Sequence, residues 1–74
     1  MKFENIETLI DNSGEISIGR AGPIRCAATA SDEGQCLAML SRRPNELFEE
    51  LLARLDFAIA DAIKRQVFVD EING

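Results

Sequence analysis

The sequence predicts an α+β fold with the element order αβββα. In this fold a three-stranded antiparallel meander is covered on one face by a short N-terminal helix and a long C-terminal helix. Three observations carry the prediction: residues 44–66 have a clear helical period, residues 15–30 contain two stretches of alternating apolar and polar residues, and glycine-containing turns separate the segments. Helices that follow a run of strands favour an α+β layer arrangement.

The long helix is predicted over residues 44–66. Its apolar residues recur at intervals of three and four and, at 100° per residue, gather into one arc of roughly 160° that is predicted to face the core. They are Leu47, Phe48, Leu51, Leu52, Leu55, Ala58, Ile59, Ala62 and Ile63. Pro44 suits a first helical position. Acidic residues near the start and Lys64 and Arg65 near the end match the helix dipole.

Phe57 breaks this pattern, because it projects about 160° away from the centre of the apolar arc. If the helix continues past Gln66, Phe68 falls close to the same azimuth and forms a second apolar stripe with Phe57. A helix of this length spans ~33 Å, whereas strands of six or seven residues span ~20–23 Å. The helix is therefore predicted to extend beyond the sheet. Two interpretations stay open: the N-terminal segment or the tail covers the stripe and the extending part of the helix, or another chain covers them.

The elements before the long helix are shorter. Residues 3–11 read as an amphipathic helix that ends in a Gly-containing turn at residues 11–14. Residues 15–20 alternate and predict a first strand with Ile16 and Ile18 facing inward.

A second strand is predicted over residues 24–30, with Cys26, Ala28 and Ala30 on one face and Arg25, Ala27 and Thr29 on the other. This is followed by a third strand over residues 35–41, which is apolar on both faces. Such a strand is either covered on both faces within the fold or has an open face that contacts another molecule. Leu37 and Met39 are assigned to the open face of this strand. The tail at residues 67–74 could be further helix or a short edge strand.

The two cysteines are predicted to be free. If residues 31–34 close a hairpin, Cys36 lies near Ala30 and Cys26 near Leu40, which is too far apart for a disulfide. Free thiols suit a reducing compartment, and we expect a cytoplasmic protein with no membrane segment and no signal peptide. Residues 1–74 are expected to form a single domain, near the size at which association would help stability.

Catalytic chemistry is not indicated. The chain contains no histidine, its five glycines form no phosphate-binding pattern, and the two cysteines lack redox spacing. Every Asp and Glu is predicted to lie on a helix surface or in a turn. We therefore expect no enzyme activity, no catalytic residue, no cofactor and no metal ion.

Charge is distributed unevenly along the chain. Residues 16–43 carry four arginines and two acidic residues, whereas residues 44–74 carry three basic and seven acidic residues. The order αβββα is similar to that of double-stranded-RNA-binding domains, which grip phosphates with a lysine cluster at the start of the last helix. Here Arg42 and Arg43 are followed by three glutamates. Nucleic-acid binding through Arg20, Arg25, Arg42 and Arg43 is therefore a weaker alternative.

The acidic helix surface has two interpretations. Its spaced carboxylates could imitate phosphates and occupy a basic groove, as in a phage or mobile-element type inhibitor of a host nucleic-acid-binding protein, or they could simply solvate the helix. The residues are Glu46, Glu49, Glu50, Asp56 and Asp61.

The resulting functional prediction is a non-enzymatic protein-binding module such as an inhibitor, adaptor or small subunit. Apolar residues remain exposed after one core has been assembled, which favours a contact surface. The candidate partner-binding residues are Arg25, Leu37 and Met39 on the sheet face and Phe57 and Phe68 on the outer helix stripe. The alternative is a homodimer in which these surfaces serve only self-assembly.

Overall fold

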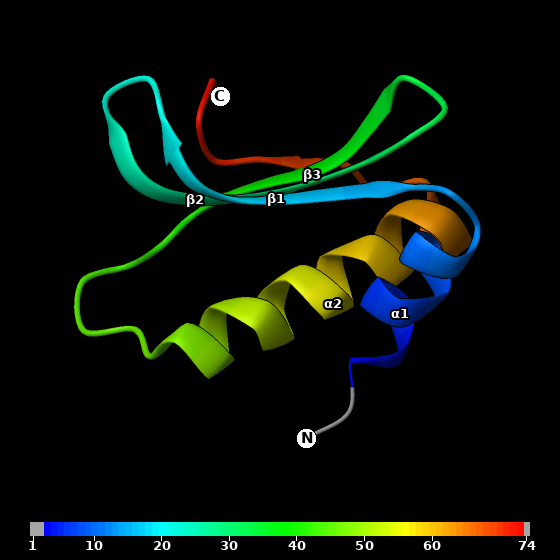
Figure 1. The fold of residues 1–74 in the computed structure, drawn as a ribbon, viewed down its shortest axis with the longest axis horizontal. Helices are drawn as coiled ribbons and strands as arrows, with labels where there is room; N and C mark the ends of the chain where they lie inside the picture. The colour runs from blue at the N-terminus through cyan, green and yellow to red at the C-terminus, as the bar shows by residue number, and fades with distance from the viewer. Residues whose placement is uncertain (1–2, 74) are drawn as a thin grey trace.

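The computed structural model describes residues 3–73, which form one four-stranded sheet with two helices beneath it (Figure 1). The element order is α1 (Glu4–Asp11), β1 (Glu15–Ala21), β2 (Ile24–Asp32), β3 (Gln35–Ser41), α2 (Phe48–Arg65) and β4 (Val69–Asp70). The predicted αβββα order is confirmed, and both helices lie on the same face of the sheet. No helix within residues 3–73 has the length and apolar content needed to cross a membrane.

The strands lie in the order β1-β2-β3-β4. The first three pair antiparallel, with Ile18 opposite Ala28 and Ala28 opposite Leu40. β4 pairs parallel to β3, so the chain passes from β3 through α2 to β4 as a crossover connection. Of the tail, which the sequence left open between helix and strand, residues 69–70 form a short edge strand and residues 71–73 a turn, whereas residue 74 lies outside the described residues.

Leu37 departs from the predicted alternation. Ala30 lies opposite Ala38, but Ser31 lies opposite Cys36, so Leu37 is an extra residue on β3. An inserted residue forms a β-bulge and interrupts the alternation of side chains between the two faces. Leu37 consequently belongs to the core, with 6% of its surface exposed, and its assignment to the open sheet face was wrong.

The cysteine positions also differ from the predicted register. Cys36 lies opposite Ser31 rather than Ala30, and the Cys26 carbonyl accepts the Arg42 N–H instead of lying level with Leu40. Both thiols are free, as expected.

The core lies between the sheet and α2. The largest fully buried side chains are Leu40, Leu51, Leu55 and Ile59. Across from the helix leucines the sheet presents small side chains, including Ala28, which is fully buried. Because the strands present small side chains, the helix can approach the sheet closely. Most of the bulky side chains in the core therefore come from α2.

The long helix begins later than predicted. Pro44 and Asn45 are the middle residues of a β-turn, in which the Glu46 N–H donates to the Arg43 carbonyl at 3.0 Å and Asn45 has a φ of 66°. Proline followed by a residue with positive φ is the signature of a type II turn. The helix starts at Phe48, where the Glu50 carboxylate accepts the Leu47 N–H at 2.8 Å. The assignment of Pro44 to the first helical turn was therefore wrong.

The helix also ends earlier, at Arg65. Gln66 adopts the left-handed conformation, with a φ of 57°, which terminates a helix. Phe68 lies in the connection between α2 and β4, so the predicted continuation of the Phe57 stripe along one helix was wrong.

Candidate protein-binding groove

An open groove of about 420 Å³ runs between α2 and the β3–β4 edge of the sheet. We call it the α2 groove. Its lining combines apolar side chains from three elements with charged side chains, and the residues are Leu40, Arg43, Ala53, Arg54, Phe57, Ala58, Asp61, Val69 and Glu71. Apolar concavities with a few fixed polar groups are the usual shape of binding sites.

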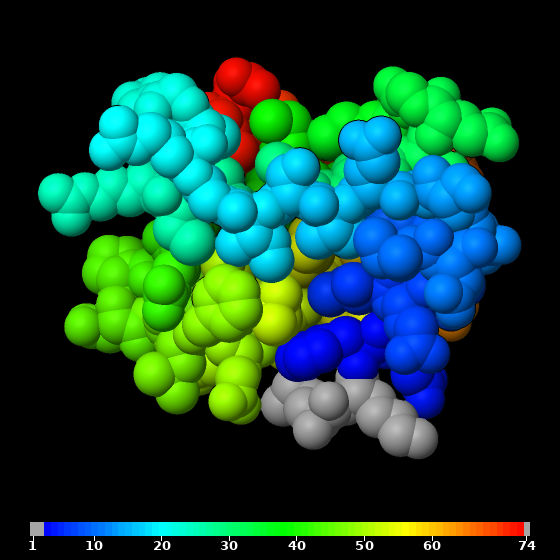
Figure 2. All heavy atoms as spheres, in the orientation of Figure 1, coloured from blue at the N-terminus to red at the C-terminus, as the bar shows by residue number. Residues whose placement is uncertain are grey.

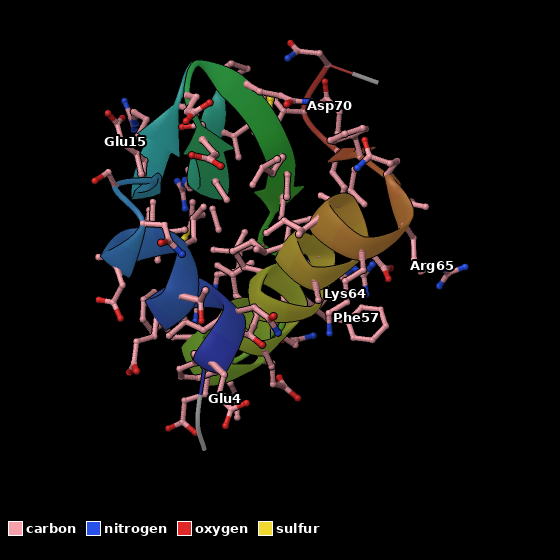
Figure 3. The ribbon with its side chains drawn as sticks, turned by 90° about the vertical axis from the view of Figure 1, so that its right-hand side faces the viewer. Glu4, Glu15, Phe57, Lys64, Arg65 and Asp70 are labelled. Atoms are coloured by element: carbon pink, nitrogen blue, oxygen red, sulfur yellow. The ribbon has the colours of Figure 1, made fainter. Side chains whose placement is uncertain are left out.

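Phe57 lies beside this groove with 66% of its surface exposed. Figure 3 shows its ring on the outer side of α2, directed away from the body of the protein. This is the orientation that the helical period predicted. Phe68 is 46% exposed and lies on the connection between α2 and β4, not on the helix itself.

Arg54 organises one end of the α2 groove. Its Nε donates to Glu46 Oε2 at 2.7 Å and its Nη2 donates to Glu46 Oε1 at 3.0 Å. Nη2 also donates to the Ser41 carbonyl at 3.0 Å. This paired geometry uses the fork of the guanidinium and fixes the turn before α2 against the helix.

Glu46 is held as a carboxylate. Only 8% of its side chain is exposed, and its Oε1 also accepts the Arg43 N–H at 2.9 Å. The hydrogen bonds from Arg54, followed by the one from the Arg43 backbone, lower the pKa of Glu46 from 4.5 to about 2. The same pairing raises the pKa of Arg54 above its usual range. Both groups therefore stay charged throughout the neutral range.

Glu71 is the second carboxylate on Arg54. Arg54 Nη1 donates to its two oxygens at 2.9 and 3.2 Å, and Arg43 Nη2 lies 3.8 Å from Oε2. Glu71 Oε1 also accepts the Ser41 N–H at 3.0 Å. One arginine thus links the β3–α2 turn, the helix and the C-terminal tail.

Four of the five predicted acidic-surface residues have partners within the chain. Glu46 pairs with Arg54, Glu50 caps α2, and Asp61 lies 3.6 Å from Arg65. Asp56 accepts the backbone N–H groups of Asn5 and Ile6, both at 2.9 Å, and so caps the start of α1. Glu49 lies exposed in the first turn of α2.

The open sheet face brings only some of its predicted residues together. Met39 and Arg25 remain on strands that border this face, but Leu37 is in the core. Met39 is half-buried, and Asn73 Nδ2 lies 3.9 Å from its sulfur. The β1–β2 and β2–β3 ends of the sheet project at the upper left and upper right of Figure 2. A hollow of about 190 Å³ is lined in part by Ser17, Ala27 and Thr29.

Sequence reasoning missed Arg54 as the centre of a hydrogen-bond network at one end of the groove. The one signal was its position as the only basic residue in the first half of the acidic helix. Its partners come eight residues earlier and seventeen residues later, and no local period links these positions.

Within residues 3–73, no three His, Cys, Asp or Glu side chains are grouped closely enough to hold a metal ion. No protein-family model, curated protein or solved structure matches the chain.

Proposed function

We propose that this chain is a small non-enzymatic protein-binding module that engages a protein partner through the α2 groove, with Phe57 as an anchor of the contact. The observation that carries the proposal is an exposed phenylalanine next to an apolar groove. Exposed aromatic side chains at a concave apolar site are typical anchors of protein interfaces.

The charged residues of the groove favour a specific contact over non-specific hydrophobic association. Arg43 has 64% of its side chain exposed at one end, and Asp61 lies at the other end. Arg54 and Glu46 are fixed between the helix and the preceding turn, so the shape of this end of the groove is preorganised. Preorganised groups lower the ordering cost of binding.

The proposal rests on the groove and not on the acidic helix surface. The Glu46 and Asp56 carboxylates are engaged in hydrogen bonds within the chain, which makes them poor imitations of phosphates. A host nucleic-acid-binding protein remains one class of target, since the chain has a net charge of −5 and would be steered towards a basic partner.

Site-specific photo-crosslinking tests the proposal. A benzophenone amino acid at position 57 is expected to yield an adduct with one partner protein in cells of the source organism. The matched control is the same amino acid at position 10, because Ile10 is 48% exposed but lies on α1.

Identical adducts from positions 57 and 10, or none from position 57, would contradict the proposal. An adduct of twice the 8.2 kDa chain mass would instead identify the partner as a second copy.

A further inference from the structure

The outer edge of β3 is completed by the C-terminal tail, which we define as residues 67–73. Ala38 pairs with Val69 and Met39 pairs with Asp70 in a two-residue parallel ladder. The Glu71 N–H then donates to the Met39 carbonyl at 2.8 Å, and the Glu71 carboxylate accepts the Ser41 N–H. A side-chain oxygen thus takes the place that a backbone carbonyl of a longer strand would hold.

Two side chains anchor the tail. Val69 packs against the core and lines the α2 groove, and Glu71 binds Arg54. They are two residues apart, at the start of β4 and just after its end, and both line the α2 groove. Val67 and Phe68, at the start of the tail, are 43% and 46% exposed.

The site on β3 that the tail occupies, which we call the seat, therefore favours a segment of a particular chemistry. It offers backbone groups of β3 for an extended segment, an apolar site for one side chain, and a guanidinium for a carboxylate two residues later. Its charge complements an acidic segment, because both Arg54 and Arg43 approach Glu71. β4 is the shortest strand of the sheet and lies at its edge, with the Glu71 contacts as its main fastening. Short edge elements open more readily than central strands.

We propose that the β3 edge and Arg54 form a receptor for an extended segment of a partner protein that carries an apolar residue followed two positions later by a glutamate. The tail is the resident occupant, and the partner segment displaces it by adding a strand to the sheet. This inference rests on the proposed function, because Val69 and Glu71 form one wall of the α2 groove and their release widens it.

The test measures binding of a fluorescein-labelled peptide of sequence VFVDEING to the full-length chain by fluorescence anisotropy. In the wild type the tail competes at an effective concentration on the order of millimolar, so the peptide binds weakly. The variant Glu71→Lys loses the charged hydrogen bonds of the tail. We expect it to bind the peptide roughly ten- to a hundredfold more tightly than the wild type.

Two controls make the readout specific. The peptide VFVDKING, which lacks the glutamate, is expected to bind Glu71→Lys at least about tenfold more weakly than VFVDEING. Adding Arg54→Gln to Glu71→Lys is expected to remove the preference between the two peptides, because the guanidinium that reads the carboxylate is gone. Backbone amide NMR signals of Val69 and Asp70 report whether the tail has left the edge.

Several outcomes overturn the proposal. One is a released tail with no binding of VFVDEING at millimolar peptide. If the tail of Glu71→Lys stays docked, the double variant Val69→Ser/Glu71→Lys is measured, and a docked tail in that variant shows that the edge does not open.

A wild-type dimer that is lost in Glu71→Lys assigns the seat to the tail of a second copy and also overturns it. A crosslink from position 57 together with no peptide binding would leave the proposed function standing while this inference fails.

Discussion

At the scale of single residues, Arg54 has the largest structural role of the polar side chains. It makes hydrogen bonds to Glu46, to Glu71 and to the Ser41 carbonyl, and only 21% of its side chain is exposed. Charged groups with so little contact with water depend on their partners, because an unpaired carboxylate in a mostly buried position is costly.

We predict that Arg54→Ala lowers the free energy of unfolding by about 2–4 kcal/mol, because it leaves Glu46 without its main partner and releases Glu71. Urea unfolding followed by circular dichroism measures the change. The control is Arg65→Ala, whose partner Asp61 lies 3.6 Å away and whose side chain is 71% exposed. That change should cost no more than about 0.5 kcal/mol, and an equal loss in both variants would refute a special role for Arg54.

At the scale of elements, the two helices depend on each other. α1 has eight residues and no side-chain cap of its own, and such a short helix is unstable alone. Asp56 on α2 supplies the missing acceptor for two of its N–H groups. Leu9 then anchors the end of α1 in the core, and the turn at Ser13, with a φ of 69°, leads directly into β1.

We predict that Asp56→Ala lowers the free energy of unfolding by about 1–2 kcal/mol and frays the start of α1, because two N–H groups lose their acceptor. Hydrogen exchange of the Asn5 and Ile6 amides should accelerate. Glu49→Ala is the matched control on the same helix and should leave these two amides unchanged. Unchanged exchange in Asp56→Ala would exclude the capping role.

At the scale of the whole molecule, hydrogen bonds to the side chains of Glu46, Asp56 and Glu71 join the helices, the turn and the tail. The lowered pKa of Glu46 makes stability depend on pH in one direction. In the unfolded chain this carboxyl titrates near 4.5, and in the folded protein near 2. Its stabilising contribution is therefore complete above pH 4.5 and is lost as the pH falls from 4.5 towards 2.

We predict that Glu46→Gln is less stable than the wild type at pH 7 and that this difference shrinks as the pH falls towards 2. Urea midpoints of both proteins at pH 7, 4 and 2.5 measure it. A difference that stays constant over this range would mean that Glu46 does not contribute through its charge.

The sequence by itself determined the layer order and much of the core. The helical period identified Leu51, Leu55 and Ile59 as buried and Phe57 as exposed, because side chains three and four residues apart share one face of a helix. It was wrong for the ends of the same arc, where Leu47, Phe48 and Ile63 are exposed. Alternation likewise identified the first two strands, although Ile18, which was predicted to face inward, is exposed while Ile16 packs against the core. These features follow from local geometry, which a single segment contains.

Only the tertiary structure decided the features that depend on distant partners. Leu37 lies in the core because pairing with β2 places a bulge at its position. Residues 69–70 form a strand because the edge of β3 is available for pairing. The Arg54 network joins residues from 41 to 71. Local periodicity reports which face a residue occupies, whereas register and long-range charge pairing arise only when the segments pack together.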